Sequence, residues 1–438
     1  MTPMALSTQP YKGARDFYPE DKRLQKYMFG KLRQVVETYG YEEIDAPILE
    51  PLNLYAAKSG DEIVNEQTYT FTDRGDRQVA IRPEWTPTVS RMVAARRQEL
   101  PYPLRWYSIP NLWRYERPQK GRLREHWQLN VDVFGLDDLA AEQELIQVAN
   151  QLLKSFGAKA SMYEVRINSR KFIDFLLRDY LKFDAVQTHS LVRLIDRMHK
   201  LERSVFEAQI DAICAAYQRD EGLVAKLVKL LEVKKIEQLP EEVQQHASVK
   251  ELKLLLESLP DVGVSNARFD TTLMRGFDYY TGVVFEVFDT DPENNRSMFG
   301  GGRYDGLVGL FGVDPVPTAG FGMGDVTLQN FLESHNLLPD LRSETDLYII
   351  LIGDVYLPAQ RIVQELRENG LRVAVDTTGR KAEKQIKTAV KKGIHYALFI
   401  GEREIENQLY ELRNLVTGEE ERHGVARIIS LLEDYRKH

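Results

Sequence analysis

Hydrophobic and polar positions follow different periods in successive parts of the chain. Residues 21–40 place apolar side chains on one face at helical spacing and end in Gly40, which predicts an amphipathic helix. Residues 43–49 form a short extended segment. Residues 104–134 alternate polar with aromatic side chains, which is typical of antiparallel strands with one polar face. We therefore expect a sheet in the N-terminal half whose polar face is available for chemistry.

The middle of the chain changes from strands to helices and back. Residues 170–258 carry long helical periodicities, for example at 191–210, and no convincing strand pattern. Strand character returns at 267–288, a glycine-rich run follows at 300–306, and another helix is expected after Gly324. This order predicts a helical insertion within a domain that is built on a sheet.

A polar connector at 332–345 leads to a third pattern, in which short apolar runs alternate with helical segments. The apolar runs are 347–351, 371–375 and 396–400, and the helical segments are 358–369 and 380–392. This alternation favours a small α/β domain with a parallel sheet. The expected segments are 1–169, 170–262, 263–335 and 345–438, where the second interrupts the first domain and the last is a domain of its own.

Composition narrows the class of protein. The chain has 438 residues, which is too long for one ordinary core, and its net charge of -8 argues mildly against a nucleic-acid partner. That argument is weak, because phosphate contacts depend on local clusters of charge. Cys214 is the only cysteine, so intrachain disulfides are excluded and a reducing cytoplasm is expected. No secretory signal and no apolar run of about 18 residues is found, so no membrane segment is expected.

A basic loop between two strands is the first candidate site. Arg114 and Glu116 end one strand, and the loop carries Arg122 before the chain returns toward Gln128 and Asp132. Guanidinium groups offer paired donors to phosphate oxygens, so a nucleotide or an RNA end is a plausible ligand. The alternative is a solvated hairpin tip with surface ion pairs.

Two further segments combine polar groups in an unusual way. In the turn at 82–87, Glu84 and Thr86 can face the same ligand, and a carboxylate beside a hydroxyl suits an ammonium group; the alternative is a turn with a helix cap at Thr86. In the stretch 275–280, Tyr279 and Tyr280 would ordinarily be core residues, although Arg275 and Asp278 flank them. The glycine-rich run matches neither a P-loop nor a dinucleotide fingerprint, and no metal ligand is assigned.

Together these segments resemble the class II aminoacyl-tRNA synthetases, specifically the histidyl-tRNA synthetase family. The stretch 12–17 resembles the family's N-terminal signature, 40–50 its dimer-forming motif 1, 114–132 its motif 2, and 275–280 its histidine-specific signature. The resemblance implies an α+β catalytic domain with an antiparallel sheet and flanking helices, a helical insertion domain, and a C-terminal α/β anticodon-binding domain. It also implies a homodimer.

The resemblance implies a histidine–tRNA ligase that uses ATP, with accompanying Mg²⁺, to charge tRNA(His) with L-histidine. The residues carried over for histidine are Glu84, Thr86, Arg114, Gln128, Asp132, Arg275, Tyr279 and Tyr280. Those for ATP are Arg114, Glu116 and Arg122; Gln119 would approach the tRNA acceptor end, and Arg114 and Arg275 would carry the chemistry. Within the histidine set, Glu84, Thr86 and Gln128 would hold the α-amino group, and Asp132 with Tyr280 would read the imidazole.

The chain departs from the family pattern at three positions. Asp132 replaces the usual glutamate, Trp85 stands where glycine is common, and Thr327 occupies the place of the arginine that supports ATP in motif 3. Two other functions are therefore considered: a non-catalytic regulatory subunit of histidine biosynthesis, and a histidine-binding sensor or RNA-binding module. The regulatory class lacks the anticodon-binding domain and erodes the histidine signature, whereas this chain keeps both, which favours the ligase.

The expected helix at 380–392 is strongly basic. Arg380 and several lysines crowd it, with Glu383 as its one acid. Contact with tRNA is one interpretation, and an ordinary solvated face is the other.

Overall fold

The computed structural model describes residues 6–56, 66–119, 121–274, 279–294 and 296–437. It divides into two compact units. One unit extends to Leu338 but leaves out Tyr18–Leu24, and the other combines Tyr18–Leu24 with the chain from Pro339 onward. In the described part of the chain, no helix is both long and apolar enough to span a membrane.

The larger unit is built around a mixed sheet with the strand order β1-β5-β7-β12-β11-β10-β8-β9, and β6 also pairs with β7. The strands are β1 (Glu42–Glu43), β5 (Leu104–Ser108), β6 (Asn111–Trp113), β7 (Glu125–Phe134), β8 (Tyr163–Ser169), β9 (Ala267–Phe269), β10 (Val283–Asp289), β11 (Ser297–Arg303) and β12 (Thr318–Gly324). Pairs β1–β5 and β8–β9 are parallel and the others are antiparallel. The predicted antiparallel sheet is thus confirmed, with parallel strands at its two edges.

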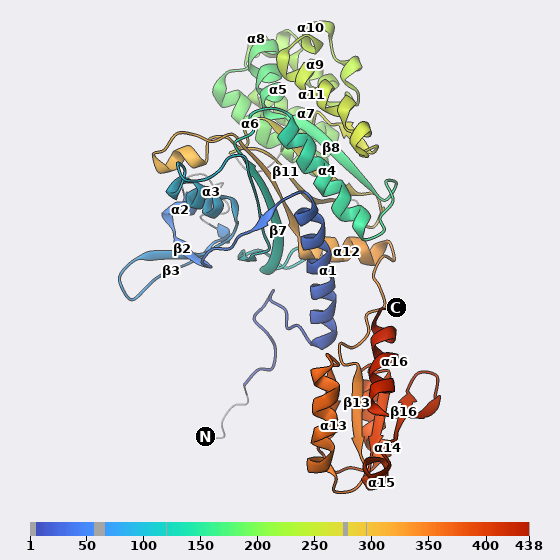
Figure 1. Ribbon diagram of the computed structural model, residues 1–438. Coiled ribbons are helices and arrows are strands. Elements are labelled where there is room, and N and C mark those ends of the chain that lie inside the picture. The colour runs from blue at the N-terminus through green and yellow to red at the C-terminus, as the bar shows by residue number, and fades with distance from the viewer. Residues whose placement is uncertain (1–5, 57–65, 120, 275–278, 295, 438) are drawn as a thin grey trace. The chain divides into compact units, whose positions relative to one another are not determined.

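Helices and a second, smaller sheet accompany the main sheet (Figure 1). The helices are α1 (Pro19–Thr38), α2 (Asn53–Ala56), α3 (Thr86–Ala95), α4 (Ala140–Ser155) and α12 (Asp325–Ser334). The small sheet has the order β2-β4-β3, formed by Leu49–Pro51, Gln78–Ile81 and Tyr69–Thr72. Helix α1 lies within two residues of its predicted range, and α12 begins directly after Gly324, as predicted.

The helical insertion follows β8. Its elements are α5 (Arg170–Asp174), a π-helical turn (Phe175–Tyr180), α6 (Ala185–Asp196), α7 (Arg203–Ile213), α8 (Ala216–Asp220), α9 (Leu223–Leu231), α10 (Glu241–Gln244) and α11 (Ala247–Ser258). The helical pattern at 191–210 is divided between α6 and α7, whose buried residues Leu191, Leu194, Phe206 and Ile210 face a common core. Figure 1 shows these helices gathered at one end of the sheet.

The smaller unit carries a five-stranded sheet with the order β14-β13-β15-β16-β17. Its elements are β13 (Leu347–Leu351), α13 (Tyr356–Glu368), β14 (Val373–Val375), α14 (Ala382–Lys391), β15 (Tyr396–Ile400), α15 (Glu402–Asn407), β16 (Tyr410–Asn414), β17 (Glu420–His423) and α16 (Val425–Lys437). The pairs among β14, β13 and β15 are parallel, as predicted, whereas β15, β16 and β17 are antiparallel. The expectation of a purely parallel sheet is therefore corrected by this added hairpin.

Candidate functional site

Strand β7 directs its polar side chains into a pocket on one face of the main sheet. Gln128, Asn130 and Asp132 stand at alternate positions of this strand, so all three point to the same face. The pocket is lined by nearly all the described residues that the sequence predicted: Glu84, Thr86, Arg114, Glu116, Arg122, Gln128, Asp132, Tyr279 and Tyr280. These residues come from four separate parts of the chain, and the sheet brings them together.

Asp132 is the most unusual group in the pocket. Its side chain is 3% exposed, one carboxylate oxygen accepts a hydrogen bond from the Tyr304 hydroxyl, and the other oxygen has no hydrogen-bond partner among the described residues. Burial raises the pKa of this carboxyl to about 7, although the bond from Tyr304 acts in the opposite direction. A buried oxygen of this kind is suited to accept a hydrogen bond from a ligand.

Three tyrosine rings form a wall next to Asp132. The ring centroids of Tyr279 and Tyr280 are 5.0 Å apart, and that of Tyr304 lies 5.7 Å from the first and 6.4 Å from the second. All three belong to a buried apolar cluster with Leu273 and Val284. The interpretation of Tyr279 and Tyr280 as core residues and their assignment to the site are thus compatible, because the rings are buried and also line the pocket. Arg275, which the sequence assigns to histidine binding and catalysis, lies outside the described residues, as does Asp278.

The strand end at Arg114 provides a cationic region. The Arg114 Nε donates to the carbonyl oxygen of Pro83 over 2.9 Å, which ties the motif 2 arm to the turn at 82–87. Its Nη1 lies 3.9 Å from Glu116, and the Arg122 Nη1 lies 3.4 Å from the same carboxylate. The Arg122 side chain is 64% exposed, so it can turn toward a ligand. Two guanidinium groups on either side of one carboxylate suit a nucleotide, because phosphates need cations and the adenine amino group needs an acceptor.

The turn that carries Glu84 and Thr86 is held in place by hydrogen bonds from the neighbouring Arg82. Arg82 is buried and donates to the carbonyl oxygens of Asn111 and Ala46 over 2.9 and 2.8 Å. Glu84 is buried and lines the pocket, and Thr86 begins helix α3 rather than capping it, because the N-cap position belongs to Trp85. The Trp85 ring is 1% exposed and packs in a core cluster with Val89 and Phe134, so the bulky residue at this position is accommodated by burial.

Gln119 lies at the tip of the motif 2 hairpin. Its amide donates to the carbonyl oxygen of Arg122 over 3.0 Å, and the Arg122 amide donates back over 2.9 Å. Gly121 adopts a φ of +80°, a conformation that favours glycine in so tight a turn. Gln119 is exposed and does not line the pocket, whereas the other predicted residues that the structure describes do.

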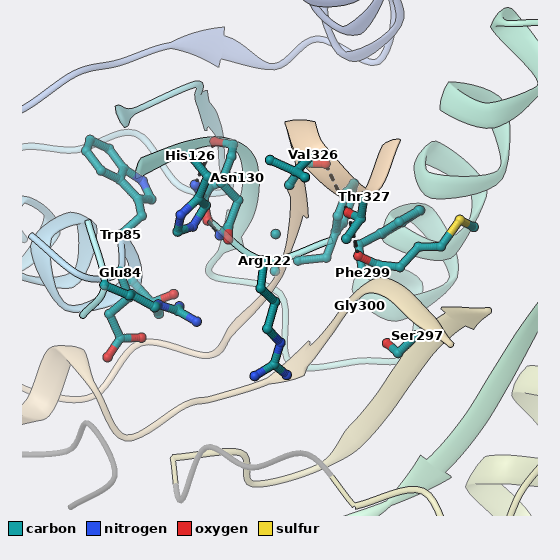
Figure 2. A pocket seen from close by; sticks show the side chains of 18 of the residues that line it. Glu84, Trp85, Arg122, His126, Asn130, Ser297, Phe299, Gly300, Val326 and Thr327 are labelled. Carbon is teal, nitrogen blue, oxygen red and sulfur yellow. Dashed lines mark hydrogen bonds between the residues drawn. The ribbon is translucent and has the colours of Figure 1, made fainter. Parts of the chain in front are cut away.

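His126, Asn130 and Tyr304 are among the residues that line the pocket but were not assigned to a site from the sequence. Burial lowers the pKa of His126 to about 3, and the charges of Arg114 and Arg15 add to this effect, so the imidazole is neutral at physiological pH. Asn130 stood in the polar alternation of β7 and was therefore detectable. Tyr304 had no local signal, because its partner Asp132 is far away in the sequence. Figure 2 shows His126, Asn130 and Trp85 together at one end of the pocket.

Glycines of β11 and β12 form the floor of the pocket. In the ladder, Gly320 pairs with Asp132 and Gly322 with Asn130. A Cβ atom at Gly320 would lie 2.3 Å from the Asp132 Oδ1, and one at Gly322 would lie 2.2 Å from the Gln128 Nε2. Of the glycine-rich run at 300–306, Gly300, Gly301 and Gly302 lie in the buried strand β11 and pair with β12, whose glycines lack side chains and so leave room for polar groups of β7 and for a ligand.

For the histidine and ATP sites that the resemblance implies, we expect Gly320→Ala and Gly322→Ala to impair histidine binding more than ATP binding, because the added methyl groups displace Asp132 and Gln128. The KM for histidine should rise about tenfold or more, with a loss of stability of about 1–3 kcal/mol from overpacking. Steady-state kinetics and thermal melts measure both effects. Gly306→Ala is the matched control, since a Cβ there meets nothing within 4 Å. Equal changes in the three variants would contradict this description of the floor.

Comparison with known proteins gives a consistent result. Residues 13–326 match the family model described as histidyl-tRNA synthetase, and residues 346–435 match an anticodon-binding domain. The chain is 45% identical over 421 residues to the histidine–tRNA ligase of Leptospira biflexa, with 95% of each chain covered. It is 36% identical to that of Thermoplasma volcanium, covering 98% of this chain and 99% of the relative.

A solved structure of histidyl-tRNA synthetase from Nostoc sp. PCC 7120 is similar in fold, with a TM-score of 0.82 at 22% identity over 98% of this chain and 100% of the other. The expected class II catalytic fold and separate C-terminal domain are thereby confirmed. The near-complete coverage of the ligases, C-terminal domain included, favours the ligase over the regulatory subunit. The chain belongs to the histidyl-tRNA synthetase family.

Proposed function

We propose that the chain activates L-histidine with ATP and transfers the histidyl group to the 3′ end of tRNA(His). The observation that carries this proposal is the pocket itself. It combines a buried acid–phenol pair, Asp132 and Tyr304, with the Arg114, Glu116 and Arg122 group. The first set matches an imidazole and the second a nucleotide. We expect the reaction to take place in the cytoplasm.

Histidine would lie with its imidazole between Asp132 and the tyrosine wall. The buried carboxylate would accept a hydrogen bond from an imidazole N–H, and the rings of Tyr279 and Tyr280 would enclose the flat group. Glu84, Thr86 and Gln128 line the same pocket and would hold the α-amino group. A site that satisfies a polar side chain in this way rejects apolar analogues, because they leave its own polar groups unpaired.

ATP would occupy the region around Arg114, Glu116 and Arg122. A carboxylate oxygen of histidine attacks the α-phosphorus, and the bond from that phosphorus to the bridging oxygen breaks, so that pyrophosphate leaves. Arg114, and by family resemblance Arg275, would neutralise charge on the reacting groups. The terminal ribose hydroxyl of tRNA then attacks the acyl carbon and AMP leaves. Mg²⁺ is expected to arrive on the triphosphate, whose oxygens it prefers as ligands. Gln119, at the hairpin tip, would approach the tRNA end.

The direct test is histidine-dependent exchange of labelled pyrophosphate into ATP by the purified protein. We expect exchange with histidine and only background exchange with other amino acids. Absence of exchange with any amino acid would disprove the ligase proposal, and binding of histidine without exchange would favour the sensor alternative.

We also propose that the protein acts as a homodimer. Ile48 and Leu49 lie within the motif 1 resemblance and are 44% and 45% exposed; Leu49 belongs to the small sheet, as does Phe71, which is 45% exposed. Apolar side chains gathered on one exposed sheet are suited to contact with a second copy of the chain. Sedimentation analysis of Ile48→Asp should show a shift toward monomer.

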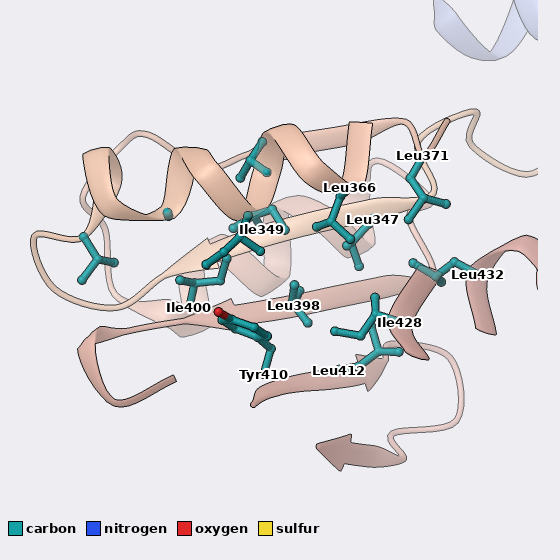
Figure 3. Packing of buried hydrophobic residues seen from close by; sticks show 14 residues of the cluster. Leu347, Ile349, Leu366, Leu371, Leu398, Ile400, Tyr410, Leu412, Ile428 and Leu432 are labelled. Atoms are coloured by element: carbon teal, nitrogen blue, oxygen red, sulfur yellow. The ribbon is translucent and has the colours of Figure 1, made fainter. Parts of the chain in front are cut away.

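The smaller unit supports a role in tRNA binding. Buried residues from its strands and from helices α13 and α16 pack into one continuous hydrophobic core (Figure 3). On α14, Gln385 and Ala389 are buried, whereas Lys384, Lys387 and Lys391 are exposed at spacings of one helical face. We propose that this face contacts tRNA phosphates.

The double variant Lys384→Glu, Lys387→Glu should bind tRNA about tenfold or more weakly and show a smaller salt dependence, because fewer counterions are released on binding. Filter binding across a range of salt concentrations measures both. Arg361→Glu with Arg403→Glu changes the net charge equally at exposed sites on α13 and α15 and serves as the control. Equal weakening by the two double variants would show that net charge matters and not this face.

A further inference from the structure

Thr327 is uncharged and already engaged, although it stands where motif 3 is expected to offer an arginine to ATP. Its hydroxyl lies 2.9 Å from the carbonyl oxygen of Met298 and 3.1 Å from that of Gly324, so it joins the start of α12 to β11. Thr327 nevertheless lines the pocket together with Ser297 and Arg122. This end of the pocket therefore keeps its position in the fold but lacks the charge that the family pattern places there.

Arg296, directly before β11, brings a guanidinium group close to Gly121 and Thr327, although Arg296 itself does not line the pocket. The point at which a Cβ atom of Gly121 would lie is 3.6 Å from the Arg296 Nη1 and 3.7 Å from the Thr327 Cγ2. Gly121 itself lines the pocket and precedes Arg122. Side chains at 296 and 327 thus approach one position on the motif 2 hairpin from two different elements, the start of β11 and the first turn of α12.

The surroundings of this point suit an anion. Arg122 is the next residue of the hairpin, Ser297 follows Arg296, and the Asn330 amide Nδ2 lies 3.7 Å from the same Gly121 position. Guanidinium and amide N–H groups donate hydrogen bonds, and phosphate oxygens accept them. Figure 2 shows Ser297 and Thr327 on the opposite side of the pocket from Glu84 and Trp85, with Arg122 between them.

We propose that Arg296 binds the terminal phosphates of ATP, in place of the arginine absent at position 327. This inference rests on the proposed function, since it assigns the triphosphate of ATP to one end of the same pocket. Arg122 and Arg296 would hold the phosphates from the two sides of the hairpin turn. In this arrangement the guanidinium group of Arg296 takes the place of the arginine expected at position 327. Thr327 itself keeps a structural role.

The test compares Arg296→Ala, Arg296→Lys and the double variant Arg296→Ala, Thr327→Arg. Arg296→Ala should weaken ATP binding in equilibrium dialysis and raise the KM for ATP about ten- to hundredfold, with the KM for histidine within about twofold of its original value. Arg296→Lys should recover part of the affinity, because lysine keeps the charge without the paired donors. The double variant should recover more, since it restores a guanidinium at the family position.

Arg193→Ala, at an exposed arginine on α6, is the control and should leave both constants unchanged. ATP affinity unchanged in Arg296→Ala would overturn the inference, and so would equal effects on histidine and ATP. Equilibrium dialysis measures ATP binding without turnover. The role of Arg296 and the proposed ligase activity can therefore be disproved independently. A wild-type protein that binds ATP but exchanges no pyrophosphate refutes the ligase proposal, while the Arg296 comparison still decides the role of Arg296.

Discussion

Replacing Asp132 by asparagine should raise the KM for histidine about ten- to hundredfold while the KM for ATP changes by about twofold or less. The carboxylate is buried, and among the described residues only its Oδ1 has a hydrogen-bond partner, Tyr304. Loss of a charge-assisted hydrogen bond at such a site has an effect of this size. Equal effects on the two substrates would contradict the role of Asp132 in reading the imidazole.

The same variant should change the pH dependence of histidine binding. With a pKa of about 7, Asp132 gains a proton as the pH falls from 8 to 6 and loses the charge that attracts an imidazole N–H. The KM for histidine should therefore rise toward acid pH in the wild type. Free histidine titrates in this range as well, but that contribution is common to both proteins, so the ratio of their KM values isolates Asp132. A ratio that does not vary with pH would count against the assignment.

Asp132→Asn should weaken histidine binding but raise the thermal stability of the protein at high pH. Because the folded-state pKa of Asp132 is raised above 3.8, its contribution to stability is present at low pH and is lost as the pH rises through about 7. Asparagine carries no charge, so Asp132→Asn should melt at a higher temperature than the wild type at pH 8 and show no such gain at pH 4. A variant that binds histidine poorly and yet is more stable has lost a ligand contact, since a structural defect would lower both properties.

Replacing Arg114 by alanine should lower the rate of pyrophosphate exchange about a hundred- to thousandfold, which is the effect of removing one preorganised donor from a reacting anion. The Nε bond to Pro83 fixes the guanidinium against the turn that carries Glu84, so the other nitrogens are directed by the fold. Single-turnover adenylation measures the chemical step directly and separates it from binding.

Arg114→Lys distinguishes charge from geometry. Lysine keeps the positive charge but cannot donate to Pro83 and present a planar pair of donors at once. We expect this variant to recover less than about a tenth of the lost rate. Full activity of Arg114→Lys would show that only charge is needed at this position. Arg91→Lys, at an arginine that bonds Glu50 outside the pocket, is the control for arginine replacement in general.

The elements predicted correctly from the sequence are those with a clear periodicity of apolar residues within the element itself. Helix α1 and strands β5 and β7 follow from apolar and aromatic spacing, and the alternation of β7 already placed Gln128 and Asp132 on one face. Strands β16 and β17 were not predicted from the sequence. Charged residues such as Glu420 and Arg422 occupy this exposed hairpin, so its apolar pattern is weak. Domain boundaries stay predictions, although the division near Leu338 lies close to the expected connector.

The site was less accessible to local patterns. The arginines proposed to bind phosphate stood out because they lie in a loop, whereas the proposed roles of Tyr304 and Arg296 depend on contacts across distant strands. The glycine-rich run matches neither a P-loop nor a dinucleotide fingerprint, and its strand was not predicted because glycine is a poor indicator of strands. The ladder between β11 and β12 supplies the missing information, since Gly300 faces Gly322 and Gly302 faces Gly320.

A pocket whose floor is bare backbone limits how its specificity can be redesigned. Every replacement of Gly320 or Gly322 adds atoms within 3 Å of a β7 side chain, so mutant libraries at these positions would return mostly damaged proteins. Useful diversity lies instead at Tyr279 and Tyr280, whose rings line the same pocket. An engineer who wants this scaffold to accept a histidine analogue with a bulkier ring should therefore carve space from the tyrosines and leave the glycine strands untouched.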